Sequence, residues 1–336
     1  MKTLKNKVIL LTGAGGGIGF ETAQVLASKE AFIIIVDIDK DKGSKAVQQI
    51  NNHYPNSAVY YEVDLSDASQ VKKLCDDVYR EYGCPDVVFN NATIVPLGSI
   101  GDVDIVTWDK SYFVNLRAPI LLANYFLPYM RKRNSGCLIF VSSSGAAPFM
   151  GAYETFKTAQ VEVSNTLALE LENTNVYSYT IGPGLVKTDT AEKSIIRIAS
   201  NTGMSIDEFY DMNKAHILSA TEASTGFALS ILNAEKYHGQ EISSIQVLND
   251  FHYYTQTDVV NEESLIFDTE LIDRIMTTFQ EQYDGWNNMN IFERQWVLRD
   301  FKKHVGCSAD KAKSELLEMQ KQFDNTKNIA KYYQTF

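Results

Sequence analysis

Val8-Ile9-Leu10-Leu11-Thr12-Gly13-Ala14-Gly15-Gly16-Gly17-Ile18-Gly19, followed by Phe20 to Ala27, is the stretch that decides the fold. Residues 8–11 form an apolar run too short for a helix, as expected of a strand buried on both faces of a parallel sheet. Residues 20–27 carry apolar side chains at helical spacing. The order strand, glycine turn, helix predicts a phosphate-binding turn, because glycines let the backbone approach a pyrophosphate and the helix N-terminus offers free amide groups.

Six further apolar runs have the character of strands. They span residues 31–36, 59–63, 86–89 and 138–141, a run that ends at Ile181, and residues 239–248. Helical segments separate several of them, at about 41–52 and from a cap at Ser66 or Asp67 to Tyr82, where Gly83 ends the helix. We therefore predict an α/β fold over residues 1–252, a doubly wound parallel sheet of the Rossmann type with seven strands.

Asp37 ends the second predicted strand, about twenty residues after the glycine turn. A carboxylate at this place accepts hydrogen bonds from the adenosine ribose hydroxyls and repels a 2′-phosphate. The glycine turn contains no Arg or Lys to hold that phosphate. The pattern therefore favours NAD over NADP, with Asp39 able to share the role. The alternative is that Asp37 only caps a turn at the end of a strand.

The composition excludes several classes of function. The net charge of −11 argues against a nucleic-acid partner, which a basic face would capture. The four cysteines lack metal-ligand spacing, so we expect idle thiols in a reducing compartment and no metal site. No apolar segment is long enough to cross a membrane, and no cleavable signal follows the N-terminus, so we expect a cytoplasmic protein.

The stretch from Val141 to Lys157 places a hydroxyl, a phenol and an ammonium close together in the chain. If Tyr153 opens a helix, Lys157 lies one turn later on the same face, where its positive charge favours the ionised phenol. Tyr153 would then exchange protons near neutral pH. A tyrosine four residues before a lysine also arises by chance, so the pair carries weight only together with other motifs.

Several motifs follow one another in a familiar order. They are Thr-Gly-x-x-x-Gly-x-Gly at 12–19, Asp64-Leu65, Asn90-Asn91-Ala92, Asn115, the serine run 142–144, Tyr-x-x-x-Lys at 153–157 and Pro183-Gly184. Together they resemble the short-chain dehydrogenase/reductase family in its conventional form, over about residues 5–250. One position departs from that pattern, because Thr93 stands where the family usually has glycine, and its side chain would narrow the nicotinamide pocket or be tolerated after a small shift.

The resemblance implies a set of cofactor-binding residues. They are Gly13, Gly17, Ile18 and Gly19 for the pyrophosphate, Asp37, Asp64 and Leu65 for the adenosine, and Asn91, Tyr153, Lys157, Pro183, Val186 and Thr188 for the nicotinamide riboside. It also implies four catalytic residues, namely Asn115, Ser143, Tyr153 and Lys157. Asn115 would hold a proton-relay water, and Ser143 would stabilise charge on the substrate oxygen. The interval from Ser143 to Tyr153 is shorter than is common, so Ser142 and Ser144 remain rivals.

Two segments lie outside these motifs. Residues 190–218 should form a substrate lid, and its apolar side chains suggest an apolar or bulky substrate or merely anchor the lid. They are Ile195, Ile196, Ile198, Met204, Phe209, Tyr210 and Met212. Residues 253–336 exceed a conventional member, and their apolar spacing predicts a helical C-terminal extension that packs on the core or on a neighbouring subunit. We expect a homodimer or homotetramer.

The pattern as a whole predicts an NAD-dependent oxidoreductase that interconverts a secondary alcohol and a ketone, with Tyr153 as acid and base. Two alternatives stay open. One is an NAD(H)-binding sensor or scaffold without turnover, against which the presence of all four catalytic residues argues. The other is an NAD-dependent epimerase or dehydratase, whose chains have this length. The substrate itself is not predicted.

Overall fold

A computed structural model of the chain describes residues 3–143, 148–186, 192, 195–196, 205–212 and 217–253. The strands are β1 (Val8–Thr12), β2 (Phe32–Asp37), β3 (Ala58–Glu62), β4 (Val87–Asn90), β5 (Gly136–Val141), β6 (Val176–Gly182), β7 (Leu185–Val186), β8 (Ile217–Leu218) and β9 (Glu241–Ser243). The helices are α1 (Gly17–Ser28), α2 (Lys40–His53), α3 (Ala68–Tyr82), α4 (Ile105–Tyr112), α5 (Ala118–Arg133), α6 (Gly151–Glu170), α8 (Ile206–Met212), α9 (Ala220–Ser230), α10 (Ala234–Tyr237) and α11 (Ser244–Asp250). A π-helical turn, Phe113–Arg117, joins α4 to α5, and a short 3-10 helix, Ile231–Asn233, joins α9 to α10.

Within the described residues, one sheet contains seven strands in the order β3-β2-β1-β4-β5-β6-β9. Every neighbouring pair in it is parallel. The strand order reverses between β1 and β4, so the crevice beyond their carboxyl ends is where a doubly wound fold binds its ligand. The predicted doubly wound sheet of seven strands is confirmed.

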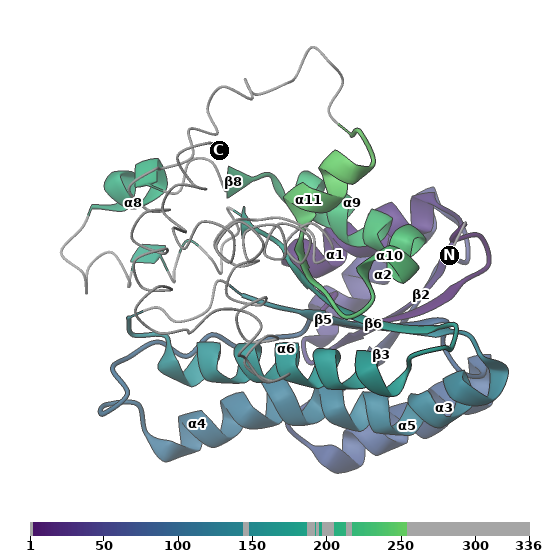
Figure 1. Cartoon of the computed structure of the whole chain (residues 1–336), viewed down its shortest axis with the longest axis horizontal. Helices are drawn as coiled ribbons and strands as arrows, with labels where there is room; N and C mark the ends of the chain where they lie inside the picture. The colour runs from purple at the N-terminus through teal and green to yellow at the C-terminus, as the bar shows by residue number, and fades with distance from the viewer. Residues whose placement is uncertain are drawn as a thin grey trace, which may run out of the picture. The chain divides into compact units, whose positions relative to one another are not determined.

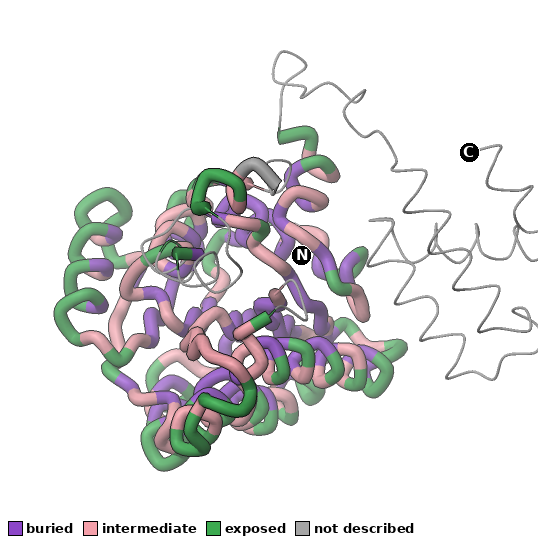
Figure 2. Tube along the Cα trace, turned by 90° about the vertical axis from the view of Figure 1, so that its left-hand side faces the viewer, coloured by how far each residue is buried: buried purple, intermediate pink, exposed green. Residues whose placement is uncertain are grey.

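Helices cover both faces of this sheet (Figure 1). Helices α3, α4, α5 and α6 lie on one face, and α1, α2, α9, α10 and α11 lie on the other. Each face has its own apolar cluster, and β1 contributes to both because its side chains alternate: Ile9 and Leu11 belong to one cluster and Leu10 to the other. This is why the strands are continuous apolar runs, and Figure 2 shows their buried segments inside exposed helical turns.

The ends of α3 are set by local hydrogen bonding. Asp67, rather than Ser66, is the N-cap, since its carboxylate accepts hydrogen bonds from the amides of Ser69 and Gln70. Gly83 ends the helix with a φ of 76°, a left-handed conformation that glycine adopts without strain. The choice between two caps that the sequence left open is thus resolved.

The prediction of a strand over residues 239–248 is wrong over its second half. The strand β9 comprises only Glu241–Ser243, and Ser244 begins α11. Ser243 is the N-cap, because its side chain accepts a hydrogen bond from the amide of Gln246. The apolar residues Val247 and Leu248 are buried from a helix instead of a strand.

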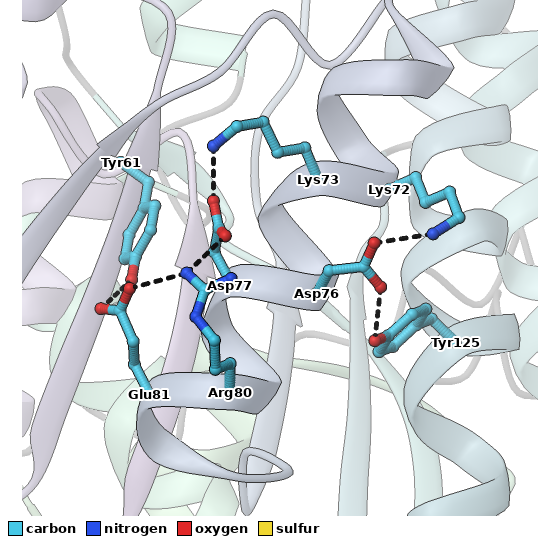
Figure 3. A network of polar contacts seen from close by, with 8 residues as sticks. All are labelled: Tyr61, Lys72, Lys73, Asp76, Asp77, Arg80, Glu81 and Tyr125. Carbon is cyan, nitrogen blue, oxygen red and sulfur yellow. Dashed lines mark hydrogen bonds and ion pairs between the residues drawn. The ribbon is translucent and has the colours of Figure 1, made fainter.

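A network of charged and phenolic side chains ties α3 to both of its neighbours (Figure 3). Its members are Tyr61, Lys72, Lys73, Asp76, Asp77, Arg80, Glu81 and Tyr125. Two phenols make the long-range links: Tyr61 of β3 donates to Glu81 at 2.8 Å, and Tyr125 of α5 donates to Asp76 at 2.8 Å. The ion pairs of α3 itself lie on the surface and contribute little, so the phenols make the specific connection.

Several sequence predictions fall on parts of the chain for which the structure gives little or nothing. Most of the predicted lid lies outside the described residues, and so do Ser144, Thr188, Cys307 and the extension from residue 254. Among the described residues no helix is long and apolar enough to cross a membrane. In the same part of the chain, no cluster of three His, Cys, Asp or Glu side chains has the arrangement of a metal site, and Cys75, Cys84 and Cys137 are free thiols.

Candidate active site

The glycine turn between β1 and α1 forms the first part of the site. Gly13 has a φ of +65°, and a Cβ there would lie 2.6 Å from the Cα of Ala92. Gly17 has a φ of +56°, and a Cβ there would project into open space. Gly13 is therefore needed for close packing against the end of β4, whereas Gly17 keeps the mouth of the turn open for a ligand.

The carboxylate of Asp37, at the end of β2, lies directly against this turn. Its Oδ2 accepts a hydrogen bond from the amide of Gly15 at 2.8 Å, and its Oδ1 accepts from the amide of Asp39 at 3.0 Å. Asp39 caps α2 and makes an ion pair with Lys42 at 3.2 Å. Lys42 also passes close to Gly16. Lys42 was not predicted from the sequence, since it lies outside the glycine turn itself.

The end of β4 connects the glycine turn to the rest of the site. Asn91 donates from Nδ2 to the carbonyl oxygens of Thr12 at 2.9 Å and Gly13 at 3.0 Å. The main-chain amides of Asn91 and Ala92 donate to the hydroxyl of Thr12. The next residue, Thr93, lies beside Asn115 and Tyr153. The segment from Asn91 to Thr93 therefore connects the glycine turn with the predicted catalytic residues.

Asp64 and Leu65 follow β3 at the same edge of the sheet. Oδ1 of Asp64 accepts hydrogen bonds from the amide and the hydroxyl of Ser66, which folds the segment into a tight turn. Leu65 is buried and packs in the apolar cluster beneath the sheet. Ile18, at the start of α1, packs partly buried against Val186 and Leu218. The end of β3, where Asp64 and Leu65 lie, is the place expected for the adenosine.

Ser143, Tyr153 and Lys157 are brought together at the end of β5 and the start of α6. Lys157 is buried, and its Nζ lies 5.9 Å from the ring centroid of Tyr153. The ammonium has no hydrogen-bond partner within the described part of the chain. Tyr153 is half-buried, and the hydroxyls of Ser143 and Thr93 lie close enough to its phenol to lower the pKa of that group. Of the rival serines, Ser142 is buried, and Ser144 lies outside the described residues.

The pKa of Tyr153 differs from what the sequence led us to expect. Burial raises it to about 12, the charge of Glu154 adds to this, and the hydroxyls of Ser143 and Thr93 oppose it. Burial also lowers the pKa of Lys157 to about 8, against the opposing charge of Glu154. In the ligand-free protein, burial disfavours the charged form of both groups and leaves the pKa of the phenol above its ordinary value.

Asn115 lies in the π-helical turn, fully buried, with its amide group saturated. Its Oδ1 accepts from the amide of Ile94 and from the hydroxyl of Thr93, each at 3.0 Å. Its Nδ2 donates to the carbonyl of Ile94 and to the hydroxyl of Ser111. The main-chain carbonyl of Asn115 accepts a hydrogen bond from Nε2 of Gln160.

Pro183 and Val186 lie in the segment that follows β6. Val186 is buried in β7, whose parallel partner is β8. It packs against Leu218 and Ala223. Ile18, at the start of α1, packs against the same cluster. Thr188 follows outside the described residues.

The sequence analysis missed two buried polar residues of α6 that flank Lys157. Glu154 accepts a hydrogen bond from the hydroxyl of Ser143 at 2.7 Å. Gln160 is fully buried, and its Oε1 has no partner among the described residues. Helical spacing was the available signal, since residues 154, 157 and 160 lie three apart along one side of a helix.

The arrangement can be compared with known proteins. The family model described as short chain dehydrogenase matches residues 7–199. A Thermotoga maritima protein described as an uncharacterized oxidoreductase is 30% identical over 188 residues, which are 55% of this chain and 74% of the relative. Human dehydrogenase/reductase SDR family member 4 is 32% identical over 189 residues, 55% of this chain and 68% of the relative. The crystal structure of L-sorbose reductase from Gluconobacter frateurii, complexed with NADPH and L-sorbose, superposes with a TM-score of 0.64 at 23% identity, over 72% of this chain and 96% of that one.

Proposed function

The chain belongs to the short-chain dehydrogenase family, and we propose that it interconverts a secondary alcohol and a ketone by hydride transfer, with NAD as the cofactor. The observation that carries the proposal is the ammonium of Lys157, buried without a hydrogen-bond partner in the described part of the chain and 5.9 Å from the ring of Tyr153. A buried, unsatisfied ammonium is costly. It is therefore best explained by a ligand with oxygen acceptors, such as the ribose of a nicotinamide nucleotide.

The residues fit a bound dinucleotide along the whole edge of the sheet. The open space at Gly17 and the tight packing at Gly13 suit a pyrophosphate against the start of α1. Asp37 suits the adenosine ribose. When bound, the nicotinamide supplies or accepts the hydride. Lys157 would hold the neighbouring ribose, and it is the residue that links cofactor binding to the proton-transfer group.

Each catalytic residue has a separate task in the proposed reaction. Tyr153 gives a proton to the substrate oxygen in reduction and takes it back in oxidation. Ser143 hydrogen-bonds that oxygen and, when it turns its hydrogen toward it, helps to stabilise the charge that develops there. Asn115, whose amide group is held by Thr93, Ile94 and Ser111, would fix the shape of the site and position a relay water.

The choice of NAD rests on Asp37. Its negative charge at the glycine turn would repel the 2′-phosphate of NADP. Lys42, close to Gly16, opposes this preference, but its ion pair with Asp39 offsets its charge. The related L-sorbose reductase structure holds NADPH, so both cofactors need to be compared.

The test begins with cofactor binding and then turnover. Tryptophan fluorescence gives the Kd of NADH and of NADPH, and absorbance of the reduced nicotinamide follows turnover across a panel of secondary alcohols and matching ketones. We expect tighter NADH binding and turnover with at least one pair. Asp37→Ser should reduce the preference for NADH over NADPH by about tenfold or more, as expected from removing one charge beside a phosphate.

Two results would contradict the proposal in different ways. Tight NADH binding without turnover of any alcohol or ketone would favour a cofactor sensor. Tighter binding of NADPH than of NADH by the unmodified protein would refute the assignment of NAD and leave the hydride-transfer chemistry standing. Tyr54→Phe, an exposed phenol at the end of α2, is the control for tyrosine substitutions and should change neither binding nor turnover.

A further inference from the structure

Glu154 is a buried carboxylate in direct contact with the proposed catalytic serine. Its side chain is only 4% exposed, and Oε1 accepts a hydrogen bond from Oγ of Ser143 at 2.7 Å. An ionised carboxylate is only an acceptor. The single hydrogen of the Ser143 hydroxyl therefore points to Glu154, and the lone pairs of Oγ are left for other groups.

Lys157 is a charged neighbour of Glu154. It lies three residues later on α6 and is itself buried. Two opposite charges that are buried together cost less than either charge alone. The negative charge of Glu154 acts on both of its neighbours, because it raises the pKa of Lys157 and that of Tyr153.

The hydroxyl of Thr93, like that of Ser143, donates its hydrogen to a neighbouring side chain. Its Oγ1 donates to Oδ1 of Asn115 at 3.0 Å. The orientation of that amide is set by the main chain of Ile94, which donates to Oδ1 and accepts from Nδ2. The hydrogen of Thr93 is thus committed as well. In the ligand-free site, the hydrogens of Ser143 and Thr93 therefore already have acceptors, Glu154 and Asn115.

We propose that Glu154 is a positioning residue that holds Ser143 as a hydrogen-bond acceptor, so that the resting site binds a hydroxyl compound in preference to the matching carbonyl compound. A hydroxyl group donates to Oγ of Ser143 and accepts from the phenol of Tyr153. A carbonyl oxygen only accepts, so Ser143 would have to turn its hydrogen away from the buried carboxylate of Glu154. This inference rests on the proposed function and names the substrate form that the site prefers.

The first experiment needs neither cofactor nor substrate. In protein labelled with carbon-13 at the tyrosine Cζ, the NMR shift of Tyr153 follows its ionisation, and Tyr153→Phe assigns the signal. Glu154→Gln removes the negative charge and lets Ser143 donate to the phenolate. We expect the pKa of Tyr153 to fall by about one unit. Glu170→Gln, the same change at an exposed position of α6, should leave it unchanged.

The second experiment measures the substrate preference itself. For the alcohol and ketone pair turned over fastest, a single turnover with enzyme in excess gives the equilibrium between the two bound forms. Glu154→Gln should move it toward the bound ketone by about tenfold, as expected for one hydrogen bond to a charged group. Glu170→Gln should not move it. Should Glu154→Gln fail to fold, Glu154→Asp keeps the charge, shortens the reach to Ser143 and should shift the bound equilibrium in the same direction.

The outcomes separate the two proposals. An unchanged bound equilibrium and an unchanged pKa of Tyr153 in folded Glu154→Gln, with normal turnover by the unmodified protein, would overturn the role of Glu154 alone. A shift of the bound equilibrium toward the alcohol would also overturn it. Failure of the unmodified protein to turn over any pair would remove the proposed function and this inference with it.

Discussion

The buried ammonium of Lys157 should make the stability of the ligand-free protein depend on pH. Burial lowers its pKa from 10.5 to about 8. Between these values the unfolded chain keeps the proton while the folded protein has lost it. Stability rises with pH wherever the unfolded state binds more protons. The destabilisation caused by the buried charge is therefore fully present below pH 8 and is relieved as the pH rises toward 10.5.

The magnitude follows from the two pKa values. Integrating the proton difference from pH 7 to pH 10 gives a gain of about 2 to 3 kcal/mol in the free energy of unfolding from Lys157 alone. Other groups also titrate in this range, so the quantity to compare is the difference between the unmodified protein and Lys157→Met. Methionine has a similar length and no charge. Between pH 7 and pH 10 the free energy of unfolding of the unmodified protein should therefore gain about 2 to 3 kcal/mol relative to that of Lys157→Met.

Urea unfolding at pH 7, 8, 9 and 10, followed by far-ultraviolet circular dichroism, measures this difference. The control is Lys45→Met, which removes an exposed ammonium from α2. Its difference from the unmodified protein should stay constant, because that ammonium is hydrated in both states. A difference for Lys157→Met that also stays constant within about 0.5 kcal/mol would refute the reasoning, since Lys157 would then keep its proton in the fold.

Three further predictions concern individual residues. Tyr153→Phe should lower turnover by about 10² to 10⁴ without weakening NADH binding, and near-normal kcat would remove Tyr153 from the mechanism. Gly17→Ala places a Cβ in the open space where the pyrophosphate is proposed to bind, at a φ of +56° that strains alanine. Calorimetry should therefore give at least tenfold weaker NADH binding. Unchanged affinity would exclude this turn from the cofactor site. Asp67→Ala removes the N-cap of α3 and should lower the Tm by about 2 to 4 °C in a thermal scan, whereas Ser66→Ala should not.

The sheet was predictable from the sequence because its signals are local. Ile9, Leu10 and Leu11 are apolar without interruption, and the structure buries them in clusters on both faces of β1. Gly83 stops α3 where the sequence placed its end. The end of the sheet was harder, since Val247 and Leu248 are apolar in a strand or a helix alike. The cap at Ser243 decided for the helix, over a stretch too short to show a helical period.

The polar interior of the site was less predictable, because it depends on partners far apart in the chain. Thr93 stood out as a departure from the family pattern, but its bond to Asn115 joins residues 22 positions apart. The contact between Ser143 and Glu154 depends on how the chain returns from β5 to α6. Spacing on a helix placed Tyr153 and Lys157 on one face. Their pKa values follow from burial, which spacing does not reveal.

These pKa values also define the resting protonation state of the site. With a pKa of about 12, the Tyr153 phenol is ionised in only about one molecule in 10⁵ at pH 7, whereas Lys157, at about 8, still carries most of its charge. Toward the substrate oxygen, the site therefore presents one donor, the phenol, and one acceptor, Ser143 held by Glu154. A hydroxyl group matches one donor and one acceptor, and a carbonyl group matches two donors. The preference of the site thus depends on Glu154, because it decides whether Ser143 donates or accepts.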